Sequence, residues 1–172
     1  MNWTSTQVRE VTDDLFEKAR AIKIGGDNVR PMLFFFLAGP GKGKPQLVVY
    51  QDQYEDKDEH RAHIDTLCAK LHPQFVARVG EAYSLSGKDV APENARDELV
   101  AAQAWMQAGK SLEDFPGRRE VIHMSVDGAG FSLQYLAEIL PTGGLAPTEV
   151  EDCKGLNAEG RFVNLSGRLG ED

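Results

Sequence analysis

Residues 32–52 constrain the fold of this chain more than any other stretch. Two apolar runs, Met-Leu-Phe-Phe-Phe-Leu-Ala and Gln-Leu-Val-Val-Tyr-Gln, flank a loop of glycine, proline and lysine at residues 39–45. Apolar runs of this length joined by a Gly/Pro loop predict a β-hairpin. Phe34, Phe35 and Phe36 are consecutive, so neither face of the first strand is polar. We therefore expect a strand in the middle of a sheet, or one that turns a face to a second protein.

The hairpin loop also contains the Gly-Lys pair that occurs in phosphate-binding loops. A P-loop follows the pattern G-x-x-x-x-G-K-[ST] and leads from a strand into a helix, whose N-terminal N–H groups meet the phosphate. Here Gly43 and Lys44 are followed by Pro45 and a second apolar run. Neither the required hydroxyl nor the helix follows, so we interpret residues 39–45 as a turn and not as a nucleotide site.

The rest of the chain alternates between helical and strand patterns. Apolar spacing and capping residues predict helices over residues 4–25, 58–71 and 92–107, the first of which begins with a capping box at Thr4 and Gln7. Alternation predicts strands over 75–85, 120–127, 131–139 and 161–166. The resulting order, α-β-β-α-β-(α)-β-β-(β), is rich in hairpins and poor in βαβ crossovers. It predicts an α+β fold: a mainly antiparallel sheet of five to six strands, with helices packed on one face.

Length and composition favour a single domain over residues 1–172. The chain has 172 residues, and its hydrophobic fraction of 41% is sufficient for one core. We expect a helical insertion at about residues 88–109 and a flexible C-terminal segment at residues 150–172, which is rich in glycine and charge.

Charge and hydropathy bear on the expected partners and location. A net charge of −8 disfavours direct binding to nucleic acid or to an anionic membrane, since both need clustered Lys and Arg. The longest apolar run, residues 31–38, is much shorter than the roughly 20 residues of a membrane helix. The N-terminus lacks the basic and apolar regions of a signal peptide. We expect a cytoplasmic protein without a cofactor or a membrane partner.

Two residues are the candidates for acid–base chemistry. Glu81 interrupts an otherwise apolar strand, and an inward carboxyl would have its pKa raised by desolvation, as a general acid or base requires. A structural ion pair, for example with Arg118 or Arg119, is the alternative interpretation. His123 lies in a strand among apolar residues, where it is either a base or a hydrogen-bonded sheet histidine.

His60 and His63 are the candidates for a metal site. They are three residues apart in a predicted helix, with carboxylates nearby, so their imidazoles share one side of the helix. Two imidazoles and a carboxylate suit a divalent metal. The pattern is H-x-x-H, however, and it lacks the glutamate of the H-E-x-x-H metalloprotease motif. The alternative is a solvated polar helix face, and we expect no metal.

Two short motifs resemble those of a group of uncharacterised bacterial and phage proteins. Glu81-Ala82-Tyr83 is similar to that group's E-A-[WY] strand, and the sequence from Pro116 to Glu120 is similar to its P-x-R-x-E strand entry. The resemblance covers residues 32–139. It implies a small intracellular α+β domain without an assigned activity. It also implies a shared surface or structural network formed by Glu81, Tyr83, Arg118 and Glu120.

Three functions follow as hypotheses. The first is a non-enzymatic, chaperone-like protein-binding module that acts as a homodimer and binds another protein through an apolar sheet face or the loop at residues 141–153. The second is a hydrolase using Glu81 and His123, or His60 and His63, which requires a pocket where at least two of them converge. The third is an acidic mimic of nucleic acid, which requires that the following carboxylates share one face: Glu55, Asp56, Asp58, Glu59, Glu149, Glu151 and Asp152.

Overall fold

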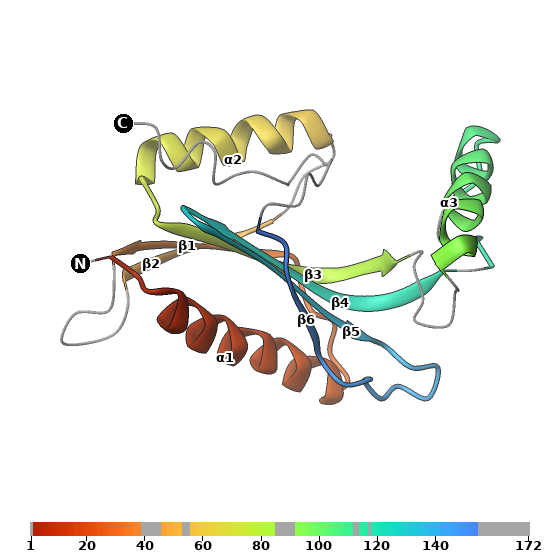
Figure 1. The fold of residues 1–172 in the computed structure, drawn as a ribbon, viewed down its shortest axis with the longest axis horizontal. Helices are drawn as coiled ribbons and strands as arrows, with labels where there is room; N and C mark the ends of the chain where they lie inside the picture. Colours follow the sequence, from red (N-terminus) through yellow and green to blue (C-terminus); the bar gives the residue numbers. More distant parts are fainter. Residues whose placement is uncertain are drawn as a thin grey trace.

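A six-stranded antiparallel sheet is the centre of the fold (Figure 1). The computed structural model describes residues 2–38, 46–52, 56–84, 92–111, 114–116 and 118–154. The strand order is β2-β1-β3-β4-β5-β6, and all five neighbouring pairs are antiparallel, with β2 and β6 at the edges. The predicted α+β class with a mainly antiparallel sheet is confirmed.

Helix α1 (Ser5–Ile24) begins with the capping box that the sequence predicts. The Thr4 side chain accepts a hydrogen bond from the Gln7 backbone, and the Gln7 side chain accepts one from the Thr4 backbone. One face of the helix buries Val8, Phe16 and Ala19 against the sheet. Its main neighbours in the sheet are β3, β4 and β5.

Strands β1 (Met32–Ala38) and β2 (Gln46–Gln51) form the predicted hairpin, and their register assigns each side chain to a face. Phe36 lies on the side of the sheet that packs against α1, which we call the α1 face. Leu33 and Phe35 point to the opposite side and pack against Ile64 of helix α2 (Lys57–Leu71). We call this opposite side the α2 face. Neither face of β1 needs to be polar because a helix lies on each side of the sheet (Figure 1).

One detail of the predicted fold is wrong: the helices do not share one face of the sheet. The α1 face continues through Phe75, Ala77 and Val79 of β3 (Phe75–Ser84), whereas Val76 of the same strand belongs to the α2 face. The run of phenylalanines therefore reflects two helical layers and not a single one with a solvated reverse side.

The remaining elements agree closely with the predicted spans. Strands β4 (Arg119–Gly128) and β5 (Phe131–Glu138) form a second hairpin, whose turn includes Gly130 at a positive φ of 86°. Helix α3 (Pro92–Gln107) has its predicted bounds, within the predicted insertion, and projects from the end of the sheet (Figure 1).

The last strand differs from the prediction. Strand β6 (Glu149–Asp152) pairs with β5, within the stretch 141–153 that we expected to be a loop. The expected strand at residues 161–166, most of the C-terminal segment 150–172 and the hairpin loop 39–45 lie outside the described residues.

Candidate functional site

Glu81 ties three parts of the fold together. Its carboxylate accepts two hydrogen bonds of 3.1 Å from the Lys23 ammonium, at the end of α1, and one of 2.7 Å from the Val29 backbone N–H. The side chain is partly shielded from water. These contacts connect β3 with α1 and with the segment leading to β1. Glu81 is therefore in an ion pair, but its partner is Lys23. The expected partners Arg118 and Arg119 pair instead with Glu120 and Glu138.

The other residues of the resemblance lie close to Glu81. Tyr83 is directly opposite Glu120 in the pairing of β3 with β4. The Arg118 guanidinium stacks over the Tyr83 ring at 5.3 Å and lies 3.9 Å from the Glu120 carboxylate. Arg118 and Glu120 also line a pocket of about 600 Å³ together with Lys23. Three cations and three carboxylates line this pocket, so it has no excess of either sign that would indicate the charge of a ligand.

His123 lies on the other face of the sheet from Glu81. In the β3–β4 register Glu81 is opposite Ile122, which belongs to the α1 face, and His123 follows Ile122 on the α2 face. Burial lowers the pKa of His123, and its imidazole hydrogen-bonds Gln134 at 2.6 Å. The structure therefore separates the two predicted catalytic residues by the thickness of the sheet, so they do not converge on one substrate.

A buried polar cluster joins His60 to Asp52 and Arg78. The Asp52 carboxylate is fully buried, accepts a hydrogen bond of 2.5 Å from Arg78 Nε and pairs with His60 Nε2. Desolvation lowers the pKa of His60, although the neighbouring Asp52 carboxylate opposes this effect. Sequence reasoning missed this cluster. The available signal was that His60 precedes Ile64 by four residues, so it shares the apolar stripe of α2.

His63 does not join this cluster. It is exposed, whereas His60 faces the sheet. Among the described residues, no group of three or more His, Cys, Asp or Glu side chains is placed to hold a metal ion.

The acidic residues of the third hypothesis fall into two groups, one at the start of α2 and one on strand β6. Asp56 caps α2 by accepting hydrogen bonds from the Asp58 and Glu59 N–H groups. The acidic residues of β6 lie at the edge of the sheet away from the strands that α2 covers. Glu55 lies outside the described residues.

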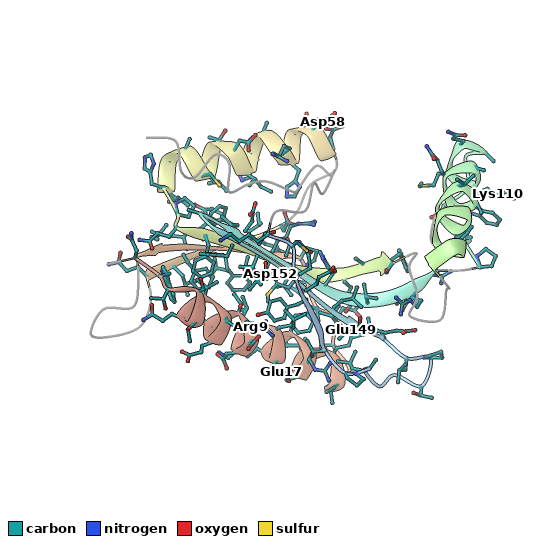
Figure 2. The ribbon with its side chains drawn as sticks, viewed as in Figure 1. Arg9, Glu17, Asp58, Lys110, Glu149 and Asp152 are labelled. Atoms are coloured by element: carbon teal, nitrogen blue, oxygen red, sulfur yellow. The ribbon has the colours of Figure 1, made fainter. Side chains whose placement is uncertain are left out.

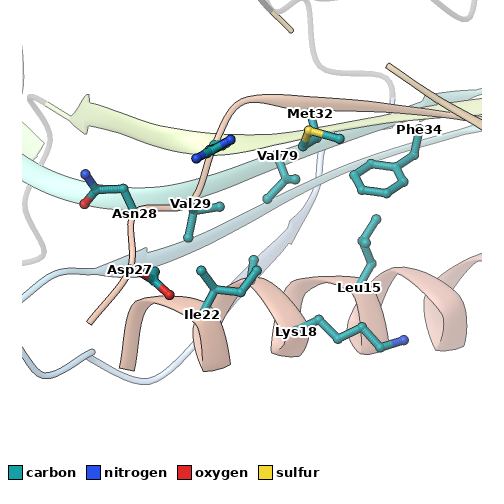
Figure 3. Close-up of a pocket in the computed structure, with 11 residues that line it drawn as sticks. Leu15, Lys18, Ile22, Asp27, Asn28, Val29, Met32, Phe34 and Val79 are labelled. Carbon is teal, nitrogen blue, oxygen red and sulfur yellow. The ribbon is translucent and has the colours of Figure 1, made fainter. Parts of the chain in front are cut away.

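An apolar groove lies between α1 and strand β1 (Figure 3). It has a volume of about 840 Å³. Figure 3 shows Leu15 and Ile22 of the helix directed toward the apolar side chains of the sheet. We call it the α1 groove, and its main apolar lining is Leu15, Ile22, Val29, Met32, Phe34 and Val79.

The edge strand β2 extends this apolar surface. Leu47 is opposite Phe36 and Val49 is opposite Phe34, so both lie on the α1 face. They are 39% and 42% exposed. All six residues of β2 are uncharged, whereas three of the four residues of β6 are acidic. Glu149 and Asp152 are two of these acids (Figure 2). Charged residues on an edge strand oppose pairing with another chain. The β6 edge has this protection and the β2 edge lacks it.

The direction of the backbone groups of β2 follows from one hydrogen bond. The Asp52 N–H donates to the Pro31 carbonyl at 2.8 Å. Backbone groups alternate in direction along an antiparallel strand, so those of Val48 and Tyr50 point toward β1, whereas those of Val49 point outward. No described strand lies beyond β2. The outer edge therefore presents main-chain donors and acceptors beside exposed apolar side chains.

Comparisons with known proteins add no relative: no family model, curated protein or solved structure matches this chain. None of the described helices is long and apolar enough to cross a membrane.

Proposed function

We propose that this chain is a protein-binding module that forms a homodimer by pairing the β2 strands of two copies. The observation that carries the proposal is the uncharged β2 edge, which presents Leu47 and Val49 on one face and outward backbone groups along its length. Strand addition at such an edge gains main-chain hydrogen bonds and buries apolar side chains together. A module of this kind holds another protein without modifying it, as a chaperone does.

The geometry of the sheet limits the register of this pairing. A two-fold axis normal to the sheet keeps both α1 faces on the same side. Residues that meet across it must then belong to the same face. Placing the axis at Val49 pairs Val49 with its own counterpart and Leu47 with Gln51 of the other copy. Val48 then meets the second Tyr50, which is a favourable β-branched and aromatic pair. About six main-chain hydrogen bonds form in this register.

Light scattering during size-exclusion chromatography, over a dilution series, tests the proposal. We expect the native protein to have twice the 19.0 kDa mass of the chain. Val49→Pro removes an outward N–H and leaves the hydrogen bonds to β1 intact, since proline is tolerated at that position of an edge strand. Blocking the central hydrogen bonds in both copies should weaken the dimer at least about 100-fold.

The matched control is Asp152→Pro at the opposite edge. The Cys153 N–H donates to the Ser132 carbonyl, so the Asp152 N–H also points outward. This variant should stay dimeric. Val49→Lys keeps the N–H but places two ammonium groups across the axis, so it tests the same interface if the proline variant does not fold. A native monomer at all concentrations, or a Val49→Lys variant that dimerises as the native chain does, would refute the proposal.

The cytoplasmic location and the kinship with the bacterial and phage group stay predictions. The charge of −8 supports the expectation that the partner is a protein and not a nucleic acid.

A further inference from the structure

The α1 face has room for a second helix beside α1. Helix α1 packs mainly over β3, β4 and β5, and no described helix lies over β2 on this face (Figure 1). Neighbouring strands are about 4.8 Å apart, so β1 and β2 together offer a width of about 10 Å. An α-helix with its side chains has a diameter of about 10 Å. Trp3 packs on Phe36 at one end of this floor, so the open part lies along Met32, Phe34 and Val49 and has about the width of one helix.

The chemistry of the floor and wall suits the apolar side of a helix. The floor presents Met32, Phe34 and Val49 from the sheet, and the wall presents Leu15 and Ile22 from α1. Ile22 is 46% exposed although it lines the groove. A helix with apolar residues at i, i+3, i+4 and i+7 would cover these side chains as the helices of a protein core do.

The charges at the mouth of the groove select the polar side of that helix. Lys18, Asp27 and Arg30 are the charged residues that line the groove. Lys18 pairs with Asp14 of its own helix. Arg30 is exposed, and no hydrogen bond or ion pair links its guanidinium to any other described residue. A carboxylate on a partner would give Arg30 a charge-assisted hydrogen bond.

We infer that the α1 groove binds an amphipathic helix of a partner protein, one with large apolar residues on one side and acidic residues beside them. The inference deepens the proposed protein-binding function by assigning the client a structure and a charge. It does not require the dimer, because a single copy supplies all of the α1 groove.

Fluorescence anisotropy with a synthetic peptide tests this inference. The probe is a labelled peptide of about 18 residues, long enough to form a helix, with leucine on one side and glutamate on the other. A second peptide with lysine in place of glutamate is the charge control. We expect saturable binding of the glutamate peptide and at least about tenfold weaker binding of the lysine peptide.

Two matched pairs of variants locate the binding. Ile22→Glu should weaken binding at least about tenfold. Ile24→Glu should not, because Ile24 is on the same helix and 65% exposed but does not line the groove. Arg30→Glu should reduce the preference for the glutamate peptide. Lys70→Glu should leave this preference unchanged, because Lys70 is an exposed residue of α2, on the opposite face of the sheet.

The outcomes separate this inference from the proposed dimer. Binding that Ile22→Glu weakens and Ile24→Glu does not would support the groove, even if the native chain is monomeric. No saturable binding up to about 1 mM peptide, or equal binding by the Ile22→Glu and Ile24→Glu variants, would overturn the inference. If Val49→Pro dissociates the dimer, the dimer proposal holds whether or not the peptide binds to the α1 groove.

Discussion

Replacing Asp52 by asparagine should destabilise the fold strongly, because this side chain joins the sheet to α2. Its carboxylate is fully buried between Arg78 of β3 and His60 of α2. Asparagine keeps the volume but removes the charge, and it has one acceptor oxygen where the carboxylate offers two, although Arg78 Nε can only donate. Losing one partner of a buried ion pair costs about 3–5 kcal/mol. Arg78 is 25% exposed, so water compensates part of the loss, and we expect about 3 kcal/mol.

Urea unfolding followed by circular dichroism at neutral pH measures this effect. The control is Asp14→Asn, which breaks the exposed pair with Lys18 on α1 and should cost less than about 0.5 kcal/mol. The two variants lose the same charge in different surroundings. A loss below about 1 kcal/mol for Asp52→Asn would show that the cluster does not hold α2 on the sheet, and the reasoning from burial would be wrong.

Two further predictions concern stability. Burial lowers the folded-state pKa of His60 and His123 below the value of about 6.5 of a free imidazole. The unfolded chain therefore binds more protons below that pH, so stability present above pH 6.5 should fall as the pH drops through the folded pKa values. Urea titrations at about pH 7.5 and 5.5 should show this loss, and an equal loss after both histidines are changed to asparagine would contradict it. A Cβ on Gly128 would lie 2.6 Å from the Phe131 ring and 2.7 Å from Phe75 Cβ. We expect Gly128→Ala to lower the free energy of unfolding by about 1–3 kcal/mol, as measured by thermal unfolding. Gly144→Ala is the neutral control, because its Cβ would meet no atom closer than 3.8 Å. Equal stability of the two variants would rule out the close approach at Gly128.

Local patterns predicted most of the fold because each depends on neighbours in sequence. The capping box at Thr4 and Gln7 formed as expected, and α3 has its predicted bounds. Strand β6 was missed for a physical reason. Four residues with three acids have little tendency to form a strand by themselves, and Glu149–Asp152 becomes one through its pairing with β5.

The residues of the candidate sites could be identified only in part. Tyr83, Arg118 and Glu120 contact one another, whereas the hydrogen bonds of Glu81 are with Lys23 and the Val29 N–H. In contrast, the sequence could not show that Glu81 and His123 face opposite ways. A strand alternates its side chains, but the register between β3 and β4, which places Glu81 opposite Ile122, depends on segments distant in sequence.

The sequence by itself determined the elements of this protein: the hairpin of apolar strands, the helices with their caps and the antiparallel order. The sequence is sufficient for these features because secondary-structure propensity, turn residues and apolar periodicity depend only on residues close together in the chain. Only the tertiary structure decided that helices cover both faces, that Asp52 meets His60 and Arg78, and that β2 is an uncharged edge beside the α1 groove. Those features depend on which distant segments pack together, and packing is set by the burial of the whole core and not by any one stretch.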